Sequence, residues 1–146
     1  LGTPKSITNY ELRITNYAET FPVVTLDVGN PVCVLFVDDF ETIDWRGIGK
    51  ETESHPHFPF RTNVVFVKTI DENNIEIRIW DRGAGETSSS GTCSIAAAVA
   101  SNYVDKTGRK VSVHAEGGTT EAVWREDGEM MITGCADLAF TGEFIF

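Results

Sequence analysis

The chain is short of basic residues, and it has no long apolar segment. Its 12 lysines and arginines stand against 22 aspartates and glutamates, which gives a formal net charge of −10. This balance argues against nucleic acid and against an anionic membrane surface as partners, because both attract basic proteins. No apolar run approaches the about 18 residues that a membrane-spanning helix requires. We therefore expect neither a nucleic-acid partner nor a membrane partner.

Cysteine is also scarce, and its positions are scattered. The 3 cysteines are Cys33, Cys93 and Cys135. They lack the close spacing of metal ligands, and an odd number of separated thiols is typical of a reducing compartment. We expect a cytoplasmic protein without a metal, in which each cysteine is a small buried apolar residue.

A glycine-rich turn in the middle of the chain connects an apolar segment to an alanine-rich one. Residues 75–80 predict a strand, and residues 92–103 predict a helix. Such a junction brings backbone N–H groups and the positive end of a helix dipole together, which suits a carboxylate or a phosphate. The lysine of a P-loop and the third glycine of a dinucleotide fingerprint are missing, so a small carboxylate is the better candidate. The alternative is an ordinary helix start capped by Ser or Thr.

The rest of the sequence is rich in predicted strands and predicts an α+β fold. The helix over 92–103 is apolar on every side between Ile95 and Ala100, so we expect protein to surround it. An antiparallel, barrel-like sheet wrapped around this central helix would satisfy that requirement. A short polar helix is expected within residues 44–54. Strands are expected at residues 23–28, 32–37, 64–70, 75–80, 110–115, 120–125, 129–133 and 138–144.

The first 20 residues follow a different pattern. Ile7-Thr8-Asn9-Tyr10 recurs as Ile14-Thr15-Asn16-Tyr17. One seven-residue repeat is too short for a solenoid or a coiled coil. We expect an irregular terminal segment over residues 1–20, followed by a single domain over residues 21–146.

Several segments, in the same order along the chain, resemble the diaminopimelate epimerase family. The combination of an Arg-Gly-Ala-Gly-Glu-Thr segment with an Arg-Thr-Asn-Val segment upstream is specific to it. The matching segments are residues 27–31, 53–59, 61–64, 82–87, 91–92, 117–118 and 131–134. They resemble the carboxy-terminal half of these proteins and cover about residues 21–146.

The resemblance implies a fold of two similar halves, each with a sheet closed around a central helix. The family's epimerases convert LL-diaminopimelate to the meso form on the way to lysine, and they use no pyridoxal phosphate or other cofactor. The small amino-acid substrate lies between the halves. One cysteine removes the α-proton and a second cysteine, from the other half, returns one. By this resemblance Gly91 and Thr92 bind the α-carboxylate, and Asn30, Asn63 and Arg82 hold the substrate.

The chain departs from the family's pattern at the positions that carry the chemistry. Ser90 stands where the family has its catalytic cysteine, Asp81 stands where it has a glutamate, and Val32 stands where it has a histidine. The resemblance therefore implies a half-enzyme with Ser90 and Asp81 at catalytic positions. Its expected partner is a missing amino-terminal half or a second copy in a homodimer. The alternatives are a non-catalytic module that binds a carboxylate or a protein, and a truncated, inactive gene product.

Overall fold

A computed structural model describes residues 1–17 and 19–146. Within these residues, nine strands and two α-helices alternate with two short 3-10 turns, η1 (Thr15–Tyr17) and η2 (Phe40–Thr42). The helices are α1 (Trp45–Glu53) and α2 (Gly91–Tyr103). The strands are β1 (Lys5–Ile14), β2 (Glu19–Asp27), β3 (Pro31–Phe36), β4 (Asn63–Asp71), β5 (Asn74–Asp81), β6 (Gly85–Thr87), β7 (Lys110–Ala115), β8 (Gly118–Trp124) and β9 (Met130–Thr133).

The strands form one curved, open sheet in the order β1-β2-β3-β4-β5-β7-β8-β9, with β6 paired beside β5. The α+β class and the sheet around a helix are confirmed, but the closed, antiparallel arrangement is wrong. β3 pairs in parallel with β4, and β5 pairs in parallel with β7. The parallel pairs arise because a helix connects their strands. α1 lies between β3 and β4 and α2 lies between β5 and β7, so each crossover returns the chain to the end of the sheet where the earlier strand began.

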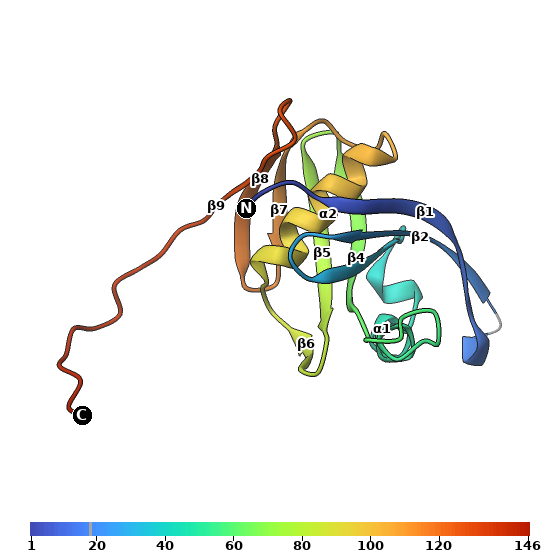
Figure 1. Cartoon of the computed structure of the whole chain (residues 1–146), viewed down its shortest axis with the longest axis horizontal. Coiled ribbons are helices and arrows are strands. Elements are labelled where there is room, and N and C mark those ends of the chain that lie inside the picture. The colour runs from blue at the N-terminus through green and yellow to red at the C-terminus, as the bar shows by residue number, and fades with distance from the viewer. Residues whose placement is uncertain (18) are drawn as a thin grey trace.

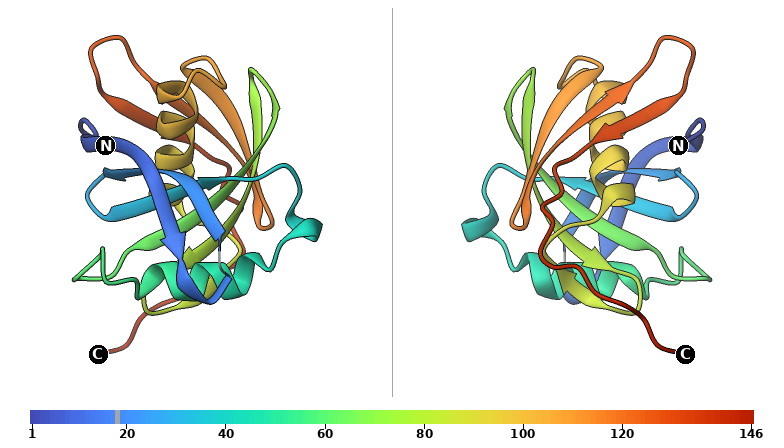
Figure 2. Two further views of the ribbon diagram at one scale, coloured as in Figure 1. Left: turned by 90° about the vertical axis from the view of Figure 1, so that its right-hand side faces the viewer. Right: turned by 90° about the vertical axis from the view of Figure 1, so that its left-hand side faces the viewer.

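Helix α2 lies inside the curve of the sheet, with strands on several sides (Figures 1 and 2). Every residue from Cys93 to Ser101 is buried, as the apolar character of all its faces requires. Ile95 and Val99 have no exposed surface, which confirms their expected burial.

The central strands are apolar on both faces because each face is covered by a helix. In β3, Val32 and Val34 face the core around α2, whereas Cys33 and Leu35 face the second core, which includes Trp45 of α1. Strands buried on both faces read as continuous apolar runs rather than alternating ones. The approach of α1 is close: a Cβ on Gly49 would lie 2.9 Å from Cβ of Trp80, so only glycine fits there.

Two sequence predictions near the termini are wrong. Residues 5–14 are not irregular, because they form β1, which pairs antiparallel with β2 from Thr8 to Ile14 and again at Lys5, with a register shift between Lys5 and Thr8. Residues 138–144 form no strand: after β9 the chain has no regular structure and leads away from the domain (Figure 1). A strand needs a neighbour for its backbone groups, and the tail has none within the described chain. No helix in the described part of the chain is long and apolar enough to cross a membrane.

The burial of α2 gives a direct test of the fold. Replacing Ile95 by Ala removes a fully buried side chain from a packed core, which costs about 2–5 kcal/mol of the free energy of unfolding. Ile70→Ala is the control, because Ile70 is 53% exposed and its truncation changes stability by about 0.5 kcal/mol or less. Urea unfolding followed by tryptophan fluorescence measures both. Equal losses in the two variants would contradict the central position of α2.

Candidate functional site

The candidate site lies where β5 leads into α2. Asp81 ends β5, a tight turn follows, β6 returns antiparallel to β5, and Ser90 precedes α2. The β7–β8 turn packs on this connection, since the Gly117 N–H donates to the Ser88 carbonyl at 2.8 Å. A Cβ on Gly117 would lie 3.0 Å from that same oxygen, so glycine allows the two segments to meet.

Ser90 is the N-cap of α2. Its backbone is extended (φ −159°, ψ 124°), and its Oγ accepts a hydrogen bond from the Cys93 N–H at 3.2 Å. The first hydrogen bond of the helix backbone runs from the Ser94 N–H to the Ser90 carbonyl, at 3.0 Å. The N–H groups of Gly91 and Thr92 precede that bond and are not used by the helix ladder. They point out of the positive end of a 13-residue helix, which favours an anion.

Both carboxylate oxygens of Asp81 accept hydrogen bonds from nearby side chains. Its Oδ2 accepts from Thr87 Oγ1 at 2.7 Å, and its Oδ1 lies 3.6 Å from Cys93 Sγ as an acceptor of the thiol hydrogen. Both contacts connect the end of β5 to the segment that leads into α2. In this arrangement the carboxylate holds the turn and the helix start together.

Asn63 and Arg82, which are far apart in the sequence, meet at the edge of the sheet. Oδ1 of the buried Asn63 accepts from the Arg82 backbone N–H at 2.8 Å. The exposed Arg82 guanidinium is directed back to the Phe60 carbonyl, 3.3 Å away. Asn63 begins β4 beside Val32 of β3, and Asn30 lies two residues ahead of Val32 in the β2–β3 turn.

A buried carboxylate that we did not predict as a site residue organises the same turn. Glu53, at the end of α1, is 7% exposed. Its Oε1 accepts from the Trp80 indole N–H at 2.9 Å, and its Oε2 lies 3.4 Å from both the Gly83 N–H and Arg61 Nη1. Glu53 begins one of the segments that resemble the family, but nothing in the sequence alone connects it to Trp80 or Gly83.

A pocket of about 480 Å³ opens beside the start of α2. Its walls come from the helix start, from the β7–β8 turn and from the beginning of the tail. Of the predicted site residues, Ser90 and Gly91 line it, together with Gly117, Thr119 and Cys135. The convergence of Asn30, Asn63, Arg82, Gly91 and Thr92 around a single ligand stays a prediction.

The thiols differ from one another. Cys33 and Cys93 are buried as expected, but Cys135 is exposed in the tail, so its expected burial is wrong. The pKa of Cys93 is raised to about 12, mainly by the loss of hydration on burial; the Ser90 hydrogen bond acts to lower it and the neighbouring Asp81 acts to raise it. Burial likewise raises the pKa of Cys33. Cys93 is therefore a neutral thiol near pH 7, unsuited to removing a proton.

Comparisons with known proteins identify relatives of the whole described domain. A family model described as "Diaminopimelate epimerase" matches residues 24–138. The diaminopimelate epimerase of Desulfitobacterium hafniense is 41% identical over 130 residues, which is 89% of this chain and 46% of the relative. That of Moorella thermoacetica is 39% identical over 144 residues, which is 98% of this chain and 51% of the relative. The chain thus spans about half the length of the curated relatives it matches.

A solved structure shares the fold at lower identity. The phenazine biosynthesis protein of the PhzF family from Enterococcus faecalis superposes with a TM-score of 0.53 and is 17% identical. The match covers 86% of this chain and 42% of that one. At this identity the likeness concerns the fold alone.

The cap geometry of Ser90 predicts its effect on stability. Ser90→Ala removes the side-chain acceptor for the Cys93 N–H, and N-cap losses of this kind cost about 0.5–2 kcal/mol. Ser90→Asp keeps an acceptor at the cap, so it restores most of that loss, and Ser89→Ala controls for removal of an exposed hydroxyl. Thermal and urea unfolding compare the four proteins. If Ser90→Ala were as stable as Ser89→Ala, the hydrogen bond from the Cys93 N–H to Ser90 would make no contribution to the free energy of unfolding.

Proposed function

Because the chain belongs to the diaminopimelate epimerase family, we propose that it forms the half of such an epimerase that binds the α-carboxylate of an amino acid. The single observation that carries the proposal is the start of α2, where the Gly91 and Thr92 N–H groups face away from the helix beside a pocket. A buried helix cannot reorient, so these donors are fixed in place before a substrate arrives. The proposed substrate is diaminopimelate, in the cytoplasmic route to lysine.

The proposed role of the helix start is to stabilise negative charge. An α-proton beside a carboxylate is a very weak acid, and its removal leaves a carbanion whose charge spreads onto that carboxylate. Backbone N–H groups and a helix dipole oppose this charge most effectively in a closed site from which water is excluded. On this proposal Arg82 and the amides of Asn30 and Asn63 orient the rest of the substrate.

On this proposal, the chain lacks a suitable proton-transfer group at position 90. The pKa of a cysteine thiol is near 8.5, whereas an alcohol is a far weaker acid, with a pKa close to that of water. The difference of about 7 units corresponds to about 10 kcal/mol, so Ser90 cannot replace a cysteine as the base. Val32 is apolar and buried, and Asp81 is engaged by Thr87 and Cys93. No strong base near Ser90 is supplied by these positions.

A non-catalytic carboxylate-binding module is the second candidate, and the hydrogen bond from the Cys93 N–H to Ser90 Oγ favours it. Serine is among the best N-cap residues, because its oxygen accepts from the helix start. A position that serves as a cap contributes to binding by keeping the helix start ordered, whether or not a proton is transferred. The two candidates share the binding step and differ in whether the parent protein turns the substrate over.

Hydrogen exchange at the α-carbon tests the proposal. We expect the 146-residue chain, incubated with diaminopimelate in D₂O, to incorporate no deuterium above a heat-inactivated control, because it lacks a suitable base. Ser90→Cys supplies a thiol on one face only, so it can exchange the α-proton but cannot invert the centre. Proton NMR measures exchange, and chiral chromatography measures inversion.

Cys135 provides the necessary control, because its exposed thiol lines the same pocket as Ser90. Each protein is therefore also assayed with Cys135→Ser. Exchange by the unmodified chain that survives Cys135→Ser would contradict the assignment of Ser90 as an inert position. Exchange that appears with Ser90→Cys and persists in the double variant supports an intact carboxylate site.

A further inference from the structure

The hydroxyl of Ser94, one turn into α2, is buried without a hydrogen-bond partner in the described chain. Ser94 is 3% exposed, and its backbone N–H takes part in the helix ladder. The other two buried hydroxyls on helices of the described chain donate to the carbonyl one turn earlier. Thr52 Oγ1 donates to Ile48 at 2.7 Å, and Ser101 Oγ donates to Ala97 at 2.7 Å. Because buried polar groups are normally paired, the exception at Ser94 requires a physical reason.

The side chain of Ser94 lies beside the helix start because of the direction that side chains take in a helix. Each Cα–Cβ bond tilts toward the N-terminus, so a side chain covers the turn before its own. For Ser94 that turn contains Ser90 and Gly91, and all three residues line the pocket of about 480 Å³. A ligand at the Gly91 N–H would therefore also lie beside the Ser94 hydroxyl.

A second unpaired hydroxyl borders this pocket from the side of the sheet. Thr120, in β8, lines the pocket, and within the described residues its buried Oγ1 has no partner. Helix α2 packs against β8, so the two unpaired hydroxyls belong to neighbouring elements. Buried polar groups that lack a protein partner are normally satisfied by an ordered water or by a ligand. The pair therefore indicates that a polar group occupies this pocket.

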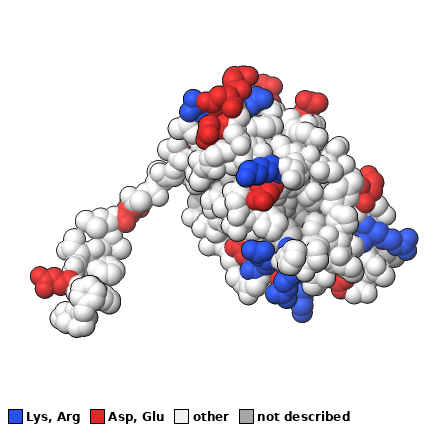
Figure 3. Space-filling model, in the orientation of Figure 1, with Lys and Arg blue, Asp and Glu red and all other residues white. Residues whose placement is uncertain are grey.

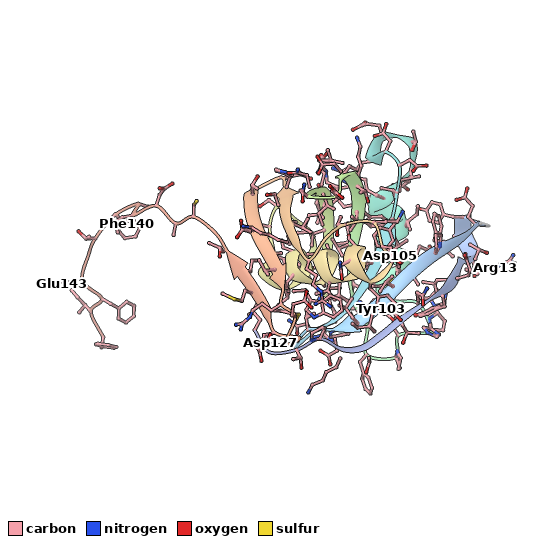
Figure 4. All side chains as sticks on the ribbon, turned by 90° about the horizontal axis from the view of Figure 1, so that it is seen from above. Arg13, Tyr103, Asp105, Asp127, Phe140 and Glu143 are labelled. Atoms are coloured by element: carbon pink, nitrogen blue, oxygen red, sulfur yellow. The ribbon has the colours of Figure 1, made fainter. Side chains whose placement is uncertain are left out.

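Neutral donors dominate the pocket. Asp137 is the one charged residue that lines it within the described chain, and its side chain is exposed to the screening of solvent. The tail that begins there carries acidic but no basic residues (Figure 3). Its later part, with Phe140 and Glu143, lies far from the body of the domain (Figure 4). An anion in this pocket would consequently be held by N–H groups, hydroxyls and the helix dipole rather than by a basic side chain.

We propose that Ser94 is a substrate-binding residue, whose hydroxyl donates a hydrogen bond to the α-carboxylate bound at the Gly91 N–H. This inference rests on the proposed function, which supplies the carboxylate. The two oxygens of a carboxylate accept several hydrogen bonds, so the hydroxyl adds to the N–H donors without displacing them. In the free chain the unpaired hydroxyl is a cost to stability, and the substrate removes that cost when it binds. Binding sites commonly combine a function with such a local loss of stability.

Two matched variants test the proposal, because each removes one buried hydroxyl from α2. Ser94→Ala removes the unpaired hydroxyl beside the pocket, and Ser101→Ala removes the paired hydroxyl that donates to Ala97. A ¹⁵N–¹H NMR titration with diaminopimelate, followed at the Gly91 amide, gives the dissociation constant of each protein. We expect Ser94→Ala to bind about tenfold more weakly or worse, as for the loss of a hydrogen bond to a charged group. Ser101→Ala should bind as the unmodified chain does.

Urea unfolding separates a binding role of Ser94 from a structural one. Ser94→Ala breaks no hydrogen bond within the protein, so its unfolding midpoint should equal or exceed that of the unmodified chain. The midpoint of Ser101→Ala should fall, because the bond to Ala97 is lost.

The outcomes distinguish this inference from the proposed function. If Ser94→Ala and the unmodified chain bound diaminopimelate equally well at the Gly91 amide, the inference would be overturned and the proposed function would stand. Equal weakening in Ser94→Ala and Ser101→Ala would show a general effect on the helix and would overturn the inference as well. If diaminopimelate shifted the Gly91 amide in none of the three proteins, the proposed function and the inference would both be wrong.

Discussion

The burial of α2 is the constraint on which the rest of the molecule depends. A helix that is apolar on every face must be enclosed, and the curve of the sheet around it follows from that requirement. Enclosure also fixes the direction of the helix axis. The N–H groups of Gly91 and Thr92 are consequently aimed at one place, and the turns around them are held there by Asn63, Asp81 and Glu53. The packing of α2 therefore determines both the curvature of the sheet and the geometry of the candidate site.

Ser90 is well suited to capping α2 but poorly suited to proton transfer. The oxygen that caps α2 is a good hydrogen-bond acceptor, but its hydroxyl is too weak an acid to act as the family's thiol would. Cys93, one turn further on, cannot compensate, since burial and Asp81 raise the pKa of its thiol. On the proposed function, this chain contributes carboxylate binding rather than proton transfer.

The sequence was a good guide wherever local pattern and tertiary environment agree. The all-apolar run predicted α2, the apolar segments at residues 64–70 and 75–80 predicted strands β4 and β5, and the Gly-rich segment predicted the junction between β5 and α2. Prediction from the sequence failed where the structure of a segment depends on a neighbouring strand. Polar β1 is a strand because β2 pairs with it, and the apolar tail is no strand because no segment among residues 1–17 and 19–146 pairs with it. The parallel pairings and the contacts of Glu53 join segments that are distant in sequence, which no local pattern reveals.

The most direct measurement of the central claim is a ¹⁵N–¹H NMR titration of the chain with diaminopimelate. Its matched control ligand is 1,5-diaminopentane, which keeps both amines and lacks both carboxylates. A carboxylate site at the start of α2 predicts that the Gly91 and Thr92 amide resonances shift with diaminopimelate and not with the diamine. Equal shifts with both ligands, or shifts confined to other parts of the domain, would contradict it.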